Sequence, residues 1–173
     1  MKKFFLFLFS LVIIVTAKAQ QPFHPYEISY DSTHGKILRG LVSRSDIETD
    51  TVFAWFKKNY NLGRPDAKAV AAFKKHAGDF KMLIFAGTWC PDTHNLLPEF
   101  YRLADAAGYP DNNISLIGVD YNKTTFDNLE KTFNVTEVPT FIVMKDGKEV
   151  GRIVEYGESG EAMKELGKIV EGL

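Results

Sequence analysis

The stretch FKMLIFAGTWCPDT, residues 80–93, decides the fold of this 173-residue chain. Its apolar run over 80–86, interrupted only by Lys81, predicts a strand that is buried on both faces. A helix is expected to follow from Pro91 to Ala107, because proline fits the first helical turn, where no backbone hydrogen bond is lost. Cys90, the only cysteine of the chain, therefore lies between a buried strand and the start of a helix.

The position of Cys90 allows two interpretations. Free cysteines are among the most buried residue types, which favours an inert core side chain. The unpaired N–H groups and the positive dipole end at the start of a helix instead favour the thiolate, the nucleophilic form of cysteine. A single cysteine cannot close a disulfide within its own chain, so Cys90 is either structural or a free thiol with a chemical role.

The residues after Cys90 act on a thiolate in opposite directions. The negative charge of Asp92 disfavours it, whereas a protonated His94 would favour it, and the Thr93 hydroxyl could donate a hydrogen bond to it. Asp92 and Thr93 also suit the first turn of any helix, so their presence has an ordinary structural explanation.

The first nineteen residues have the pattern of a secretory signal peptide. Lys2 and Lys3 precede an uncharged apolar run over residues 4–15, and Ala17-Lys18-Ala19 fits a signal peptidase site. The alternative is an uncleaved membrane anchor, but this run is shorter than the roughly 20 residues that span a bilayer. We therefore expect cleavage after Ala19, a secreted or periplasmic protein, and no stable membrane insertion.

Composition narrows the function classes further. An apolar content of 45% is typical of one compact domain with a proper core. Cleavage would remove three lysines and move the net charge from −1 to −4, without a cluster of Lys or Arg, which disfavours a nucleic-acid partner. The four histidines show no metal-ligand spacing, so neither a metal nor a cofactor is expected.

Ahead of the buried strand, the sequence predicts mostly helix. The expected elements are, in order, an irregular arm over residues 20–35, a short strand over 36–42, and helices over 45–60 and 66–76. Ser45 and Glu48 have the spacing of a capping box for the first helix. Asp66 is the expected N-cap of the second.

After the helix at 91–107, strands and helices alternate. The expected elements are a strand over 114–120, a short helix over 125–133, strands over 139–144 and 149–156, and a closing helix over 159–171. Asp146-Gly147 is a strong signal for a hairpin between the last two strands. This order predicts an α/β fold with a mixed sheet and helices on its faces.

Several of these features together resemble the thioredoxin superfamily over residues 79–172. They are Trp89-Cys90-Pro91 after a buried strand, Pro98 inside the helix, Val138-Pro139-Thr140 opening a strand, the Lys145–Lys148 hairpin turn, and Gly157 before the last helix. The resemblance implies a thioredoxin-like three-layer α/β/α core over 79–173 with a mixed central sheet. Residues 20–78 would then form an N-terminal arm and helical extension that packs on this core.

The resemblance also implies an active site. Cys90 would be the catalytic thiol, framed by Trp89 and by a cis-proline pair, Val138 and Pro139, at an edge where an extended peptide could bind. Pro91, Asp92, Thr93 and His94 would support it from the helix. Thr93 stands where this superfamily carries its second, resolving cysteine.

Without a resolving cysteine, Cys90 can form a mixed disulfide, but an outside thiol must release it. The expected function is a monothiol thiol–disulfide oxidoreductase whose partners are protein or low-molecular-weight thiols and disulfides. One alternative is a redox-inactive binding or chaperone-like module that uses the groove near Val138 and Pro139. A third is an iron–sulfur cluster shared between two chains, which needs external thiols that exported compartments lack.

Overall fold

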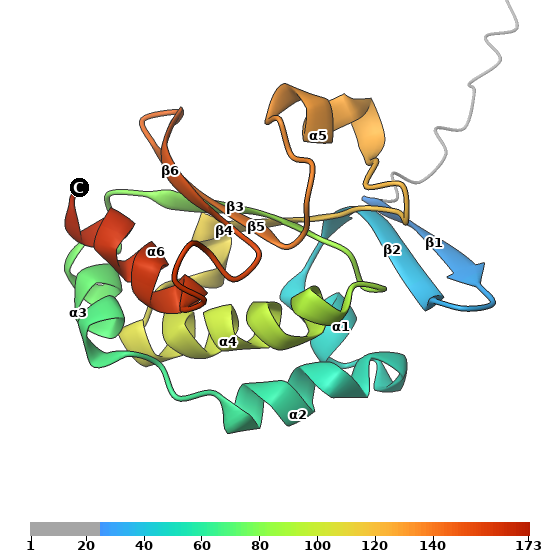
Figure 1. Cartoon of the computed structure of the whole chain (residues 1–173), viewed down its shortest axis with the longest axis horizontal. Helices are drawn as coiled ribbons and strands as arrows, with labels where there is room; N and C mark the ends of the chain where they lie inside the picture. Colours follow the sequence, from blue (N-terminus) through green and yellow to red (C-terminus); the bar gives the residue numbers. More distant parts are fainter. Residues whose placement is uncertain (1–24) are drawn as a thin grey trace, which may run out of the picture.

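The computed structural model describes residues 25–173, so the predicted signal peptide lies outside the described residues. A six-stranded sheet with the order β1-β2-β4-β3-β5-β6 forms its centre (Figure 1). The strands are β1 (Tyr26–Asp31), β2 (Gly35–Val42), β3 (Lys81–Ala86), β4 (Ile114–Gly118), β5 (Thr140–Lys145) and β6 (Lys148–Val154). β3 and β4 run parallel and the other neighbouring pairs run antiparallel, which confirms the predicted mixed sheet.

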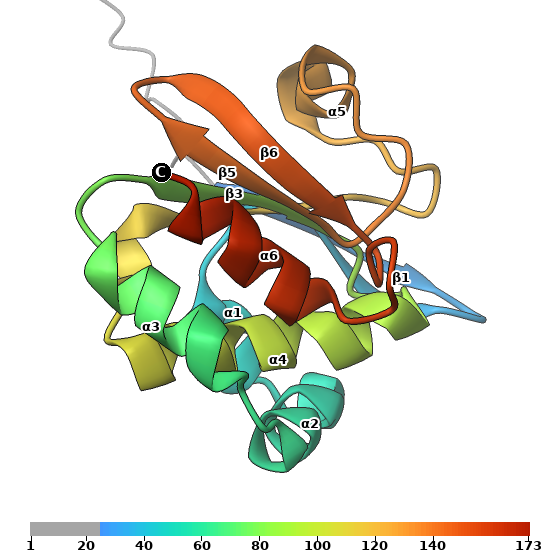
Figure 2. The same cartoon turned by 60° about the vertical axis from the view of Figure 1, so that its left-hand side comes forward.

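Helices cover both faces of this sheet. They are α1 (Arg44–Glu48), α2 (Ala54–Leu62), α3 (Ala67–Lys75), α4 (Pro91–Ala107), α5 (Leu129–Thr132) and α6 (Ala162–Glu171), with 3-10 turns at Thr51–Phe53, Asp111–Asn113 and Phe126–Asn128. Figures 1 and 2 show α5 on one face and α3, α4 and α6 on the other, with α2 outside α4. The predicted three-layer α/β/α architecture is thereby confirmed.

The expectation of an irregular arm over residues 20–35 is wrong for residues 26–31. These residues form β1, which pairs with β2 so that Ile28 lies opposite Leu38. Tyr26, Ile28 and Tyr30 alternate with polar residues, which is a strand pattern that the prediction missed, although five of the six residues are exposed. Its backbone partners come from β2, which is a tertiary contact.

The expected helix over 45–60 is divided, and its capping box was misplaced. Ser43, not Ser45, is the N-cap of α1, because its side chain accepts the Asp46 N–H and the Asp46 carboxylate accepts the Ser43 N–H. Glu48 instead pairs with Arg44 at 2.9 Å. A 3-10 turn capped by Asp50 then redirects the chain into α2.

The predicted domain boundary at residue 78 stays a prediction. β2, from the N-terminal side of that boundary, pairs with β4 from the C-terminal side, with Gly40 opposite Gly118. Gly118 is required there, because a Cβ at this position would collide with the Leu38 carbonyl. The N-terminal segment is therefore part of the central sheet.

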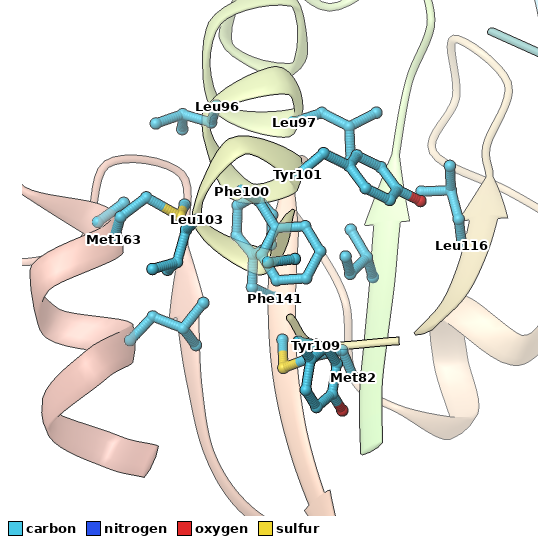
Figure 3. Packing of buried hydrophobic residues seen from close by; sticks show 14 of the residues in the cluster. Met82, Leu96, Leu97, Phe100, Tyr101, Leu103, Tyr109, Leu116, Phe141 and Met163 are labelled. Atoms are coloured by element: carbon cyan, nitrogen blue, oxygen red, sulfur yellow. The ribbon is translucent and has the colours of Figure 1, made fainter. Parts of the chain in front are cut away.

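The main core lies between α4 and the sheet (Figure 3). Leu97, Phe100 and Leu103 recur at helical spacing along α4 and are fully buried. The ring of Phe100 lies 5.5 Å from that of Phe141 on β5. This packing fixes α4 on the sheet, and with it the position of the residue at its N-terminus.

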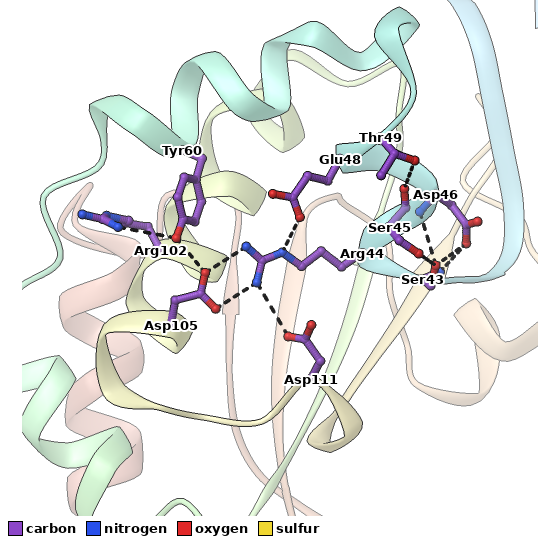
Figure 4. Close-up of polar contacts among 10 residues, drawn as sticks. All are labelled: Ser43, Arg44, Ser45, Asp46, Glu48, Thr49, Tyr60, Arg102, Asp105 and Asp111. Carbon is purple, nitrogen blue, oxygen red and sulfur yellow. Dashed lines mark hydrogen bonds and ion pairs between the residues drawn. The ribbon is translucent and has the colours of Figure 1, made fainter.

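A polar cluster ties the N-terminal helices to the far end of α4 (Figure 4). The Arg44 guanidinium donates two hydrogen bonds of 2.8 Å to the Asp105 carboxylate, and the Tyr60 hydroxyl donates a third at 2.7 Å. The bonds from Arg44 are the main reason that the pKa of Asp105 lies below its ordinary value. This cluster holds α1 and α2 against α4 at the end opposite Cys90.

Candidate active site

Cys90 is the N-cap residue of α4, directly after the loop that leaves β3. Only 7% of the residue is exposed. Its thiol donates a hydrogen bond of 3.2 Å to the Val138 carbonyl, and the Val138–Pro139 peptide bond is cis. The fold therefore brings the sulfur against a segment 48 residues away in the sequence.

Trp89 folds back over the loop that precedes Cys90. Its indole Nε1 donates to the Val119 carbonyl at 3.1 Å, which fixes the ring beside the end of β4. A Cβ at residue 87 would lie 2.6 Å from the Trp89 ring, so only glycine leaves room for it. The Gly87 carbonyl also accepts the Cys90 N–H at 3.0 Å.

Thr88 ties the same loop to β2, a contact that the sequence did not predict. Its buried hydroxyl donates to the Lys36 carbonyl at 3.0 Å and accepts the Leu38 N–H at 3.2 Å. β2 pairs with β4 only at residues 40–42, and the Thr88 side chain supplies hydrogen bonds to the β2 backbone at residues 36 and 38. The N-terminal hairpin thus helps to position the cysteine loop.

Thr93 lies fully buried in the first turn of α4. Its hydroxyl oxygen accepts the Gly87 N–H at 3.3 Å. Within residues 25–173 no hydrogen bond joins this hydroxyl to the Cys90 sulfur, so Thr93 supports the loop backbone in the thiol state. Thr93 lies one helical turn after Cys90, and its side chain faces the loop that precedes Cys90.

His94 is braced between the loop and α2. Its Nε2 donates to the Thr88 carbonyl at 2.7 Å, since a carbonyl can only accept. The imidazole stacks on Trp55 with 4.3 Å between ring centroids, and Asn59 donates to the His94 carbonyl at 2.8 Å. The structure therefore gives His94 a positioning contact to Thr88.

Pro91 and Asp92 occupy the first turn of α4, beside Cys90, as the sequence predicts. Pro91 is exposed and Asp92 is half-buried, so both border the surface around the sulfur. Their roles in the chemistry stay predictions. Val138 and Pro139 are both buried, and the exposed residue next to them is Glu137.

The tip of the β1–β2 hairpin completes this end of the molecule. His34 at the tip lies 4.1 Å from the Tyr121 ring, and Tyr121 lies 4.9 Å from the Trp89 ring, measured between centroids. No pattern in the sequence connects residues 34, 89 and 121, because each follows a different strand. Figures 1 and 2 show the hairpin and the N-terminus of α4 on the same side of the molecule.

Chemically, this arrangement presents one thiol at a helix N-terminus, in hydrogen-bond contact with the Val138 carbonyl. Residues 25–173 contain no group of three or more His, Cys, Asp or Glu side chains placed to hold a metal ion. In the same range no helix combines the length and apolar character needed to cross a membrane.

Comparison with known proteins connects this site to a family. Residues 46–169 match a family model described as thioredoxin. Thioredoxin H2 from Arabidopsis thaliana is 27% identical over 95 residues, which cover 55% of this chain and 66% of that protein. A thioredoxin from Mycobacterium tuberculosis is 34% identical over 89 residues, covering 51% of this chain and 72% of its own length. A TPR repeat-containing thioredoxin from Arabidopsis thaliana is 32% identical, but the match spans only 21% of it.

One solved structure supports the fold. An HIV epitope scaffold superposes with a TM-score of 0.50 at 18% identity, covering 69% of this chain and 82% of the scaffold. Oxidised thioredoxin O2 from Arabidopsis thaliana has a TM-score of 0.40 at 22% identity, with 61% of this chain and 83% of that chain covered. At these identities the structural likeness concerns the fold alone.

Proposed function

This chain belongs to the thioredoxin family, and we propose that it is an exported monothiol thiol–disulfide oxidoreductase acting through Cys90. A redox function of the oxidoreductase type follows from the family. The observation that carries the monothiol proposal is the pairing of Cys90 at the N-cap of α4 with a buried Thr93 in its first turn. The helix start supplies an activated nucleophile, and the chain supplies no second thiol.

The proposed reaction has two exchange steps. In the first, the Cys90 thiolate attacks a substrate disulfide, so that a bond forms between Sγ and one substrate sulfur while the other sulfur leaves as a thiolate. In the second, an outside thiolate attacks the mixed disulfide and regenerates Cys90. Each step moves one electron pair between sulfurs, and solvent takes up or supplies the protons.

Loss of the thiol proton prepares the binding edge. The Val138 carbonyl accepts the Cys90 S–H in the thiol state, and a thiolate has no proton to donate. The freed carbonyl can then accept a backbone N–H from an extended substrate placed along Glu137 and Val138. This geometry supports protein disulfides as substrates, alongside small mixed disulfides.

Export is the second part of the proposal and rests on residues 1–19. A secreted or periplasmic location would place Cys90 in an oxidising compartment, where disulfide substrates occur. The test is the mass of the protein recovered from the medium or periplasm. A mature chain beginning at Gln20 supports the proposal, and a full-length chain retained inside the cell contradicts it.

The activity test uses a neutral small mixed disulfide and the Cys90→Ser variant as the matched control. Wild-type protein should accumulate one adduct on Cys90, and turnover should begin only when an outside thiol such as glutathione is added. Cys90→Ser should show neither adduct nor turnover. Turnover without added thiol, or equal rates for both proteins, would contradict the monothiol mechanism.

A second candidate function is a redox-inactive module that binds extended peptides. The burial of Cys90, with 7% exposed, and its packing with Val138 in an apolar cluster are the observations that favour it. In that case Cys90→Ser would bind an unfolded, cysteine-free peptide as tightly as the wild type. If the protein is an oxidoreductase, we expect both the wild type and Cys90→Ser to bind such a peptide weakly.

A further inference from the structure

The turn of the β1–β2 hairpin places a carboxylate beside the proposed active site. Asp31 Oδ1 accepts the backbone N–H groups of Thr33 and His34, each at 2.8 Å, and the His34 Nδ1–H at 2.7 Å. The bonds from Thr33 and then His34 hold the pKa of Asp31 below its ordinary value, so its charge persists at neutral pH. The carboxylate nevertheless stays at the surface, with 44% of the side chain exposed.

The same turn presents an aromatic surface next to Cys90. His34 packs on Tyr121 at 4.1 Å and approaches Trp89 at 6.5 Å, so consecutive contacts link the carboxylate to the three rings, and Trp89 directly precedes Cys90 in the chain. Tyr121 is 53% exposed, which is high for a large aromatic side chain. Aromatic faces beside a carboxylate attract cations, because the ring quadrupole and the negative charge act in the same sense.

The positive side chains of the hairpin do not neutralise this region. Lys36 is engaged with Asp50 at 2.6 Å, and Arg39 with Glu27 at 3.0 Å. Near Val138, Glu137 is exposed and forms an ion pair of 2.6 Å with Lys123.

Asp92, in the first turn of α4, adds a further negative charge beside Cys90. Within residues 25–173, neither Asp31 nor Asp92 forms an ion pair with a Lys or Arg side chain.

We propose that Asp31, with Tyr121 and Trp89, selects disulfides that carry a positive charge close to the reacting sulfur. The inference deepens the proposed function and rests on it. The preferred substrates would be disulfides of amine-bearing thiols, or protein disulfides with Lys or Arg beside the cysteine. Disulfides flanked by carboxylates would react more slowly, because they meet like charge at Asp31 and Asp92.

The chemical step is the first exchange described above. The Sγ of Cys90 attacks the sulfur that carries the cationic arm, forms the mixed disulfide with it, and releases the other half of the substrate as a thiolate. The ammonium group of the retained arm would then be attracted toward the Tyr121 ring and the Asp31 carboxylate. No oxidant or reductant beyond the substrate disulfide is needed.

The test compares three small disulfides of similar size with the intact protein. They are cystamine, which is dicationic, bis(2-hydroxyethyl) disulfide, which is neutral, and 3,3′-dithiodipropionate, which is dianionic. The measured quantity is the second-order rate constant for mixed-disulfide formation at Cys90, followed by intact mass. Rates are compared between wild type and Asp31→Asn, because the ratio for each disulfide cancels its intrinsic reactivity.

Asp31→Asn keeps an oxygen that can accept the turn N–H groups and removes only the charge. We expect this variant to react with cystamine about two- to fivefold more slowly, in line with the strength of exposed charge pairs. Its rate with the neutral disulfide should be unchanged, and its rate with the dianion should rise. The effect should disappear in about 1 M salt, where the Debye length is near 3 Å.

Two further variants separate a local effect from overall charge. Asp146→Asn removes the same charge at the β5–β6 turn, at the end of β5 remote from Pro139, and should leave the cystamine rate unchanged. Tyr121→Leu keeps the charge but removes the ring and should also lower the cystamine rate. If the neutral disulfide reacts but Asp31→Asn and Asp146→Asn behave alike, the inference fails and the proposed function stands. If no disulfide reacts with Cys90, both fail.

Discussion

Thr93→Cys would test whether this site lacks only a resolving thiol. Residue 93 is fully buried, lies in the first turn of α4 and faces the loop that leads into Cys90. Side chains three residues apart on a helix have Cβ atoms about 5–6 Å apart, and a small rotation at the helix start brings them within disulfide range. The substitution should therefore allow a disulfide between residues 90 and 93.

The expected effect on stability has two parts. Replacing the hydroxyl removes the hydrogen bond that Thr93 accepts from Gly87 at 3.3 Å, which should cost about 1 kcal/mol in the reduced protein. Closing a loop of four residues should stabilise the oxidised protein by about 2 kcal/mol relative to the reduced one. Urea unfolding with and without a reductant measures both quantities on one variant.

The decisive assay starts from the mixed disulfide between Cys90 and a neutral small thiol. Thr93→Cys should expel that thiol without any outside thiol, and intact mass should show the internal disulfide. Thr93→Ser, which keeps the hydroxyl and lacks sulfur, should retain the adduct as the wild type does. An adduct on Thr93→Cys that lasts as long as that on Thr93→Ser would refute the proposed geometry of the site.

Three other substitutions test contacts that hold the fold together, one of them at the site. Thr88→Val should destabilise the fold by about 1–3 kcal/mol and slow mixed-disulfide formation, because the Leu38 N–H loses its buried acceptor; thermal unfolding and the exchange rate measure this. Arg44→Met should cost about 1.5–3 kcal/mol at neutral pH, and stability curves from pH 7 to pH 2 should converge with those of the wild type. The lowered pKa of Asp105 stabilises the fold above the unfolded value of about 3.9, and this contribution is lost as pH falls through the folded pKa. Gly118→Ala should cost about 1–3 kcal/mol in urea unfolding, because its Cβ meets the Leu38 carbonyl, whereas Gly78→Ala, with open space, should be tolerated.

Local signals in the sequence predicted most of the second half of the fold, but the expected helix over 125–133 is wrong in part, because a 3-10 turn with Asp127 at positive φ precedes the short α5. The helix over 91–107 has the predicted bounds because Pro91 fits its first turn and Gly108 ends it in the left-handed region. The hairpin at Asp146-Gly147 joins β5 and β6, with both turn residues at positive φ, as this dipeptide predicts. The ends of these elements are marked by residues inside them or directly next to them.

The N-terminal part could not be predicted equally well, because its structure depends on distant partners. β1 is exposed on most of its length and exists as a strand through its ladder to β2. The cap at Ser43 competes with a similar pattern at Ser45, and only the extended backbone of Ser43 decides between them. The alternation in Tyr26–Asp31 marks a strand but not its partner, and the sequence alone does not decide between the two rival caps.

The site likewise has features that could be predicted from the sequence and features that could not. The position of Cys90 before a helix, with Trp89 and Thr93 around it, follows from neighbours in the sequence. The brace of His94 on Trp55 and the bond from Thr88 to β2 join segments more than 35 residues apart. Such contacts arise only when the sheet and α2 are in place, so the sequence could suggest a direct effect of His94 on the thiol but not its indirect role.

The central claim is that the fold activates Cys90 as a nucleophile despite its burial. The most direct measurement is the rate at which bis(2-hydroxyethyl) disulfide forms an adduct on Cys90 at pH 7, in the native protein and in the same chain unfolded in urea. A thiol in an unfolded chain is only a few per cent ionised at this pH, so the native protein should react at least about fivefold faster. A native rate below that of the unfolded chain would show that Cys90 is a buried structural side chain.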